Sequence, residues 1–459
     1  DPLLQIPRFQ VGKTGVEAQM EQSLRGSAGH QRIEVNAVGR VMRELERAEG
    51  EQGATIKLTI NSKIQNFVLA RMDGLSASAV VIDCESGDLL AVGSSPSFDP
   101  NLFVRGISTN DYSGLRNDIF GPLRAKAVQG TYAPASTFKM MTALAALEDG
   151  VLSAEDTLFC PGHFEISNNR FHCWKRRGHG TMNVADSIIQ SCDVFFYEVG
   201  QKVGIDKISA MARRFGLGEH HDLPLSAVSR GVAPTREWKK KSFGKDWLLG
   251  DTVNASIGQG YVLASPLQLA VMAARLGTGR ALQPRLIQSI NDEQMALGAG
   301  APLDVNPEHL AVVQKAMFGV SNSKVGTAFS KRIISQDLRM SGKTGTAQIR
   351  RITAEERATG VIRNEDLPWK KRDHALFVDY APHDNPKVAV AVVVEHGGGG
   401  SSVAAPIARD ITLFALTGKM PDLDHYPAEV RKQIRSDQKN LAPKLIDWNS
   451  VSTSGQSKT

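Results

Sequence analysis

Two pairs of strand patterns, separated by a long and mostly helical stretch, constrain most strongly how this chain can fold. Each pair is bounded by turn residues, such as Glu85-Ser86-Gly87 in the first. The strands are predicted over 79–83, 89–92, 375–380 and 388–394. Helical patterns such as 136–149 and 266–276 occupy the interval. Because both pairs must bury apolar faces, we predict an α+β fold, an antiparallel sheet flanked by helices.

The chain divides into three parts by sequence texture. Residues 1–75 are polar and interrupted by glycine, with strand-like alternation over 36–41 and 55–60, which predicts a smaller, extended, β-rich N-terminal region. The large domain is predicted over 76–420. Residues 421–459 are polar and end in a serine-rich run, so they are predicted to be a C-terminal tail.

Composition excludes some function classes. With 459 residues, of which 41% are hydrophobic, the chain can bury a large core. Lys and Arg exceed Asp and Glu only by 54 to 48, spread along the chain, so we expect no nucleic-acid partner. The sequence contains neither an apolar run of about 18 residues nor a signal-peptide pattern. If the protein works outside the cytoplasm, we therefore expect its membrane anchor to precede this sequence.

The segment around Ser136 carries the first chemical motif. Pro134 at the entry of a predicted helix and Gly150 at its end place Ser136 in the first turn, on the same face as Lys139. Lys139 is the only basic residue of an otherwise apolar helix, an environment that disfavours the ammonium form and suits a base. Ser136 is therefore a candidate nucleophile. Taken alone, the segment is equally compatible with a capping serine and a snorkelling lysine.

Two further motifs favour the catalytic interpretation. Ser191-Cys192-Asp193 follows a helical stretch, and Lys343-Thr344-Gly345-Thr346 lies on a short β-prone segment in which glycine lets a ligand approach the backbone. In the order S-x-x-K, S-x-[ND], K-T-G, these motifs form the signature of the serine β-lactamase and penicillin-binding superfamily. A nucleotide-binding P-loop is excluded, because Pro7 and Asp337 stand where that motif needs its first glycine.

From Gly12 to about Leu416 the chain resembles the penicillin-binding protein 2 family, the class B transpeptidases of rod-shape elongation. Asp193 stands where many penicillin-binding proteins carry Asn, and Ala133 and Ala135 stand where Pro and Gly are frequent. The resemblance implies the serine β-lactamase/penicillin-binding transpeptidase fold and a non-catalytic pedestal over 1–75. Besides the three motifs, the similar stretches are 12–17, Arg25-Gly26, 96–101, Gly258-Gln259-Gly260-Tyr261 and 265–268.

The resemblance implies a D,D-transpeptidase that cross-links peptidoglycan stem peptides and is inhibited by β-lactams. Ser136 would attack the D-Ala-D-Ala carbonyl, Lys139 would take its proton, and Ser191 with Lys343 would relay a proton to the leaving amine. The backbone N–H groups of Ser136 and Thr346 would form the oxyanion hole. The implied catalytic residues are Ser136, Lys139, Ser191, Asp193 and Lys343, and the implied substrate-binding residues are Thr344, Gly345 and Thr346.

By the same resemblance we expect the protein at the periplasmic face of the bacterial inner membrane. Its expected protein partners are a SEDS-family glycosyltransferase and an elongation scaffold protein that contacts the pedestal. Two other functions share the motifs. A β-lactamase or D,D-carboxypeptidase usually lacks a pedestal, and a non-catalytic penicillin-binding sensor differs only in turnover.

Three of the four cysteines lie close together in the sequence around the second motif. These are Cys160, Cys173 and Cys192, while Cys84 lies on the distant first hairpin. Three thiols cannot all pair with one another, whereas three thiols and one imidazole suit a closed tetrahedral site. By resemblance His179 is the fourth ligand, and we predict a structural Zn²⁺ there. A disulfide and free buried thiols are the alternatives.

Three aromatic side chains near these motifs are expected to have no chemical role. His396 follows the last predicted strand, but a Ser-Lys mechanism needs no histidine. Trp174 and Trp369 are predicted to serve packing.

Overall fold

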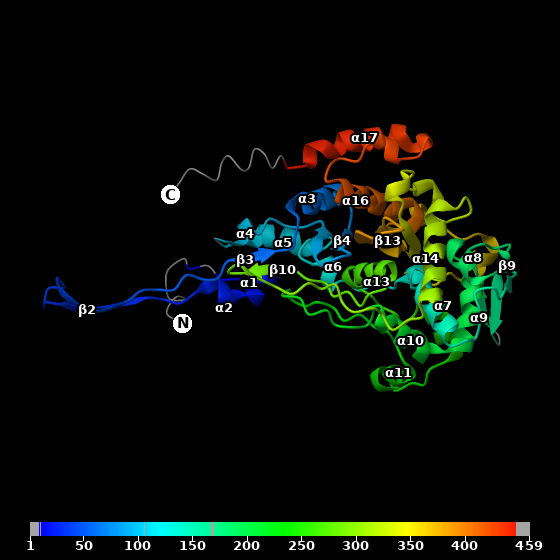
Figure 1. Cartoon of the computed structure of the whole chain (residues 1–459), viewed down its shortest axis with the longest axis horizontal. Coiled ribbons are helices and arrows are strands. Elements are labelled where there is room, and N and C mark those ends of the chain that lie inside the picture. Colours follow the sequence, from blue (N-terminus) through cyan, green and yellow to red (C-terminus); the bar gives the residue numbers. More distant parts are fainter. Residues whose placement is uncertain (1–8, 10, 105, 167–168, 447–459) are drawn as a thin grey trace.

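A five-stranded antiparallel sheet lies at the centre of the computed structural model, which describes residues 9, 11–104, 106–166 and 169–446 (Figure 1). The strand order is β12-β13-β14-β4-β5, so strands from both ends of the large domain meet. Val388 of β14 lies opposite Asp83 of β4. The predicted α+β fold with an antiparallel sheet is confirmed. The strands are β4 (Ala77–Asp83), β5 (Leu89–Ser95), β12 (Ser341–Ala347), β13 (His374–Ala381) and β14 (Val388–Val394).

Helices cover both faces of this sheet. α13 (Pro266–Thr278) packs against β14 and β4 on one face, and α16 (Ala405–Thr417) packs against β14 and β13 on the other (Figure 1). Every residue of β14 is buried, because apolar side chains project to both covered faces. α13 starts with a capping box between Ser265 and Gln268.

The helical region inserted between β5 and β12 surrounds one buried helix. α7 (Lys139–Glu148) contacts α9, α10 and α14 and is buried over nearly its whole length. Two small sheets, β6 with β9 and β7 with β8, lie against α9. The other helices of the region are α4 (Asn101–Val104), α5 (Thr109–Asn117), α6 (Lys126–Gln129), α8 (Val184–Ile189), α9 (Asp193–Val203), α10 (Ile205–Arg214), α11 (Arg236–Phe243), α12 (Leu249–Ser256) and α14 (Pro307–Asn322). Its strands are β6 (Leu158–Cys160), β7 (His163–Ile166), β8 (Asn169–His172), β9 (Gly180–Met182), β10 (Ile287–Ile290) and β11 (Glu293–Gln294).

The N-terminal region is extended. β1 (His30–Val35) and β2 (Val41–Ala48) form a ribbon that projects away from the large domain, with every residue exposed (Figure 1). The short helices α1 (Gly15–Gln19) and α2 (Glu21–Arg25) precede it, and β3 (Ile56–Leu58) pairs with β10.

The helix α3 (Ser62–Met72) packs on β5 and α16 of the large domain, although the sequence assigns it to the pedestal. The Phe67 ring stacks on the Phe414 ring with centroids 4.1 Å apart. The apolar face of this helix therefore completes the large core rather than a separate one.

Part of the segment expected to be a tail is helical. α17 (Arg431–Leu441) buries Ile434 and Leu441, and Lys444 Nζ donates a hydrogen bond to Asp73 Oδ2 at 2.8 Å. Two apolar residues seven positions apart on one face are enough to dock a mostly polar helix. The serine-rich end, 447–459, lies outside the described residues. Within the described ranges, no helix is both long enough and apolar enough to cross a membrane.

Candidate active site

Ser136 lies on a 3-10 turn (Ala135–Phe138) that leads directly into α7, so the α-helix begins at Lys139 and not at Ser136 as the sequence predicts. Ala135 has a φ of +50°, and its N–H donates to Gly258 O at 2.8 Å. A Cβ at Gly258 would collide with the Ala135 carbonyl, so only glycine allows this approach. The contact fixes the turn that carries the half-buried Ser136. Ser136 Oγ makes no hydrogen bond within the described part of the chain.

Lys139 is fully buried and points toward the second motif. Its Nζ lies 2.7 Å from Asp193 Oδ1, 3.0 Å from Ser191 O and 3.2 Å from Ser191 Oγ. The composition of its own helix predicts an apolar environment. The structure instead places a carboxylate from α9 against the amine, so Lys139 and Asp193 form a buried ion pair.

Ser191 joins α8 to α9 in a left-handed backbone conformation, with φ of +56°. A non-glycine residue in this region costs of order 1–3 kcal/mol, and it persists only where its surroundings fix it. The turn is held by Ser191 N donating to Ile188 O at 3.2 Å and by Cys192 N donating to Ser187 O at 2.9 Å. As a result Ser191 Oγ lies between two amines, 3.2 Å from Lys139 Nζ and 2.9 Å from Lys343 Nζ.

Lys343 reaches this point from β12, the edge strand of the central sheet. It is fully buried, and its Nζ also donates to Thr344 O at 3.2 Å. Burial lowers the pKa of Lys343 well below its ordinary value, and the nearby Lys139 lowers it further, while Asp193 opposes the shift. Lys343 is therefore the amine that folding drives toward its neutral form.

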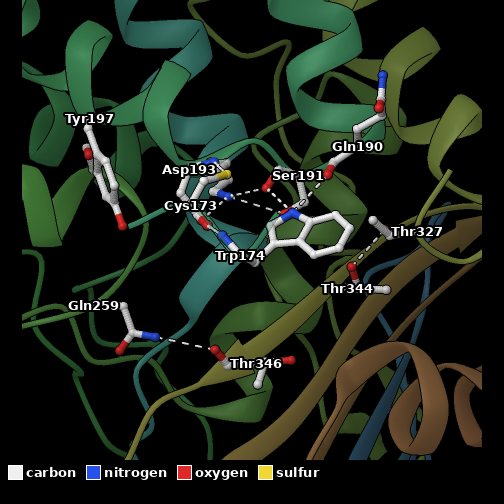
Figure 2. A network of polar contacts seen from close by, with 12 residues as sticks. Cys173, Trp174, Gln190, Ser191, Asp193, Tyr197, Gln259, Thr327, Thr344 and Thr346 are labelled. Atoms are coloured by element: carbon white, nitrogen blue, oxygen red, sulfur yellow. Dashed lines mark hydrogen bonds and ion pairs between the residues drawn. The ribbon is translucent and has the colours of Figure 1, made fainter. Parts of the chain in front are cut away.

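The rest of the third motif runs along the open edge of β12. Thr344 Oγ1 lies 2.9 Å from Thr327 Oγ1 and Gln259 Nε2 donates to the carbonyl of the exposed Thr346 at 3.3 Å (Figure 2). A Cβ at Gly345 would lie 3.0 Å from Thr137 Cγ2, against the Ser136 turn. The sequence predicts that Gly345 lets a ligand approach the backbone. In the structure, Gly345 instead lets the turn that carries Ser136 pack closely against β12.

Trp174 belongs to the site, although the sequence predicts a packing role. Its side chain is 60% exposed. Its backbone N–H donates to Asp193 Oδ2 at 2.9 Å, and its indole Nε1 donates to Ser191 O at 3.0 Å and to Gln190 O at 3.1 Å (Figure 2). The only sequence signal for this position is its place beside Cys173. Thr327 and Gln259 were likewise missed as individual site residues.

The predicted metal ligands converge directly behind the second motif. The ligand atoms of Cys160, Cys173, His179 and Cys192 all lie within 4.8 Å of one another. Cys160 Sγ and Cys173 Sγ lie 3.7 and 3.5 Å from the same His179 Nδ1, and Asp193 N donates to Cys173 Sγ at 3.4 Å. All four cysteines of the chain are free and buried, which corresponds to the third alternative considered from the sequence.

The predicted zinc cofactor is wrong: the thiols of the cluster are free, and those of Cys160 and Cys173 lie in hydrogen-bond contact with the His179 imidazole. The sequence spacing predicted that the three thiols converge with an imidazole, and the resemblance selected that of His179. Convergence alone does not fix what the groups bind, since thiols and an imidazole can satisfy one another.

Comparison with known proteins decides the family. The model described as penicillin binding protein transpeptidase domain matches residues 77–413, and the model described as penicillin-binding protein dimerisation domain matches residues 6–58. This chain belongs to the penicillin-binding protein transpeptidase family.

Relatives of this penicillin-binding protein include the peptidoglycan D,D-transpeptidases MrdA of Haemophilus influenzae and Escherichia coli. The first is 36% identical over 94% of this chain and 67% of its own length, and the second is 38% identical over 91% of this chain and 66% of its own length. The chain thus spans about two thirds of these relatives.

Solved structures show the same architecture. Pseudomonas aeruginosa PBP2 in complex with WCK 5153 aligns with a TM-score of 0.78 and 33% identity, covering 94% of this chain and 88% of its own. Helicobacter pylori PBP2 in complex with MreC aligns with a TM-score of 0.79 and 31% identity, covering 89% of this chain and 73% of its own. The predicted resemblance to penicillin-binding protein 2 and the transpeptidase fold are confirmed, and the predicted transpeptidase function is confirmed at the level of the family.

Proposed function

We propose that this penicillin-binding protein is a peptidoglycan D,D-transpeptidase that works through an acyl-Ser136 intermediate. The observation that supports this most directly is the hydrogen-bonded series Lys139, Ser191, Lys343, which ends beside the Ser136 turn. Three motifs from a buried helix, a strained turn and a sheet edge supply it, and the curated relatives carry the same activity in their names.

The charges of the site suggest how Ser136 is activated. Lys139 forms an ion pair with Asp193, while burial lowers the pKa of Lys343 and so favours its neutral amine. When Lys139 gives a proton to Ser191 Oγ, and Ser191 gives its own to Lys343, Lys139 becomes the neutral base. It then accepts the Ser136 hydroxyl proton while Ser136 Oγ forms a bond to the D-Ala-D-Ala carbonyl carbon.

The same series completes the acyl transfer. As the tetrahedral intermediate collapses, the bond between the carbonyl carbon and the D-Ala nitrogen breaks. Ser191 donates its proton to that nitrogen and receives one from Lys343. Lys139 is left protonated beside Asp193 and Lys343 is left neutral, so the site regains its resting state. An acceptor amine then attacks the acyl-Ser136 ester, with the proton transfers running in reverse.

The open edge of β12 provides the surface for the donor peptide. An edge strand presents unpaired backbone groups, which an extended peptide can bind as an additional strand. Thr344 and Thr346 hydroxyls would hold the terminal carboxylate, and the N–H groups of Ser136 and Thr346 would stabilise the oxyanion. Gln259, hydrogen-bonded to Thr346 O, would keep this edge in place.

One observation favours transfer to an amine over hydrolysis. A hydrolase needs a base that activates water against the acyl-enzyme. Both oxygens of the Asp193 carboxylate are engaged, one by Lys139 and the other by the Trp174 N–H. Asp193 is therefore poorly placed to serve as that base.

We further propose the location and partners that the resemblance implies, the periplasmic face of the inner membrane, a SEDS-family glycosyltransferase and an elongation scaffold protein. Among structural neighbours, Helicobacter pylori PBP2 forms a complex with MreC, and another belongs to a peptidoglycan synthase complex. The β1–β2 ribbon exposes apolar side chains suited to a protein partner. They are Ile33, Val35, Val38, Val41, Met42 and Leu45.

The experiment that tests the proposed function measures turnover. Protein supplied with a pentapeptide-bearing peptidoglycan polymer should release D-Ala and form cross-linked peptides, and the Ser136→Ala variant should do neither. Release of D-Ala without cross-links would indicate a carboxypeptidase. Acylation by penicillin without any D-Ala release would indicate a sensor.

A further inference from the structure

We propose that Trp174 is a positioning residue, which holds Ser191 and Asp193 where both can act on Lys139. The inference rests on the proposed acyl-Ser136 mechanism and adds a residue that none of the three motifs contains.

Trp174 contacts the second motif at two places. Its backbone N–H fixes Asp193 Oδ2 at 2.9 Å, while Lys139 Nζ holds Oδ1 at 2.7 Å. Its indole N–H donates to Ser191 O at 3.0 Å (Figure 2). The same carbonyl accepts from Lys139 Nζ at 3.0 Å. The carboxylate and the carbonyl that orient Lys139 are therefore both held on their other side by Trp174.

The two hydrogen bonds that Trp174 donates to Asp193 Oδ2 and Ser191 O are called the Trp174 clamp below. The strained turn at Ser191 explains why this clamp is needed. A residue with φ of +56° relaxes unless its neighbours hold it. Without the indole donor, Lys139 Nζ is the only side-chain donor that Ser191 O keeps among the described residues, and that amine must also take the Ser136 proton. Relaxation of the turn would move Ser191 Oγ out of the line between the two lysines.

The exposure of Trp174 and its hydrogen bonds indicate a positioning role and not a packing role. The side chain is 60% exposed, so its burial contributes little to stability. The clamp has a second anchor, because the neighbouring Cys173 accepts a hydrogen bond from Asp193 N at 3.4 Å. We therefore expect loss of the indole N–H to change the rate of chemistry more than the stability of the fold.

The test compares Trp174→Phe, which keeps an aromatic ring and loses the N–H, with Trp369→Phe as the matched control. Trp369 packs against Phe120 and His396, and its indole N–H makes no hydrogen bond within the described ranges. Stopped-flow measurements with a fluorescent penicillin give the non-covalent dissociation constant and the acylation rate constant separately. The fluorescent penicillin labels only molecules that can be acylated. The measured rate constant therefore does not depend on how much of a variant is misfolded.

For Trp174→Phe we expect the acylation rate constant to fall about 10- to 100-fold, the effect of a misplacement on the order of 1 Å. The dissociation constant and the melting temperature should stay close to wild type. Trp369→Phe should acylate at the wild-type rate. Trp174→His, which can place a ring N–H near the same carbonyls, should recover part of the rate.

Three results would overturn the proposal. The first is an unchanged acylation rate constant in Trp174→Phe. The second is weaker non-covalent binding with an unchanged rate constant, which would mean that Trp174 only contacts the ligand. The third is a decrease in rate constant no larger than that of Trp369→Phe. All three leave Ser136 acylated, so they count against the clamp and not against the proposed function. A wild-type protein that is not acylated at Ser136 would refute the proposed function itself.

Discussion

Replacement of Lys343 by methionine should stabilise the folded protein at neutral pH while abolishing acylation. Lys343 is fully buried, and burial lowers the pKa of its amine well below the ordinary value. The unfolded chain therefore binds a proton at this residue that the folded chain does not. Methionine removes this penalty and is similar in size.

The sign and magnitude follow from proton linkage. Between the lowered folded-state pKa and an unfolded value of about 10.4, the unfolded state binds more protons, so wild-type stability rises with pH by up to about 1.4 kcal/mol per unit. At pH 7 this penalty amounts to roughly 5 kcal/mol at most. Loss of the hydrogen bonds to Ser191 Oγ and Thr344 O subtracts about 0.5–1.5 kcal/mol each. A net gain of up to about 2–4 kcal/mol at pH 7 should fade toward pH 10.

Urea denaturation followed by circular dichroism at pH 6 to 10 measures this difference, with Lys202→Met as control, because that side chain is 48% exposed. The control should show no comparable trend with pH. A Lys343→Met variant that is less stable than wild type at pH 7, or whose difference from wild type does not change with pH, would contradict a neutral Lys343.

Three other predictions test the proposed mechanism. Lys139→Arg should fold, since guanidinium can still pair with Asp193, but should lose acylation by several orders of magnitude because arginine cannot act as a neutral base; normal labelling by fluorescent penicillin would remove Lys139 from the mechanism. The penicilloyl enzyme should persist for minutes or longer after excess penicillin is removed, because Asp193 is engaged at both oxygens, whereas release within seconds would favour a hydrolase. Gly345→Ala should slow acylation about 10-fold or more, because its Cβ would lie 3.0 Å from Thr137 Cγ2 and displace the Ser136 turn; an unchanged rate would show that the turn yields without cost.

The sequence predicts the sheet well because strand patterns are local. The run 79–83 lies within β4, and the run 388–394 coincides with β14. Their nearly continuous apolar character identifies them without knowledge of their partners. The three motifs, recognised by their residues and their order in the chain, also come together in the structure around Ser191 Oγ. Their chemistry is fixed by a few residues, which stand out even in a single sequence.

Contacts between distant segments were not predictable in the same way. The helix around Lys139 appears apolar in sequence, and its carboxylate partner comes from another helix. The role of Trp174 depends on two carbonyls exposed by a strained turn, which no residue pattern specifies. The cysteine spacing predicted the convergence of three thiols and an imidazole but not their state.

Mass spectrometry of the protein after treatment with penicillin tests the central claim most directly. Digestion should place one penicilloyl group per chain on the peptide that contains Ser136, and fragmentation should assign it to that side chain. Ser136→Ala should carry no adduct. An adduct on another residue, or full labelling of Ser136→Ala, would contradict the assignment of Ser136 as the nucleophile.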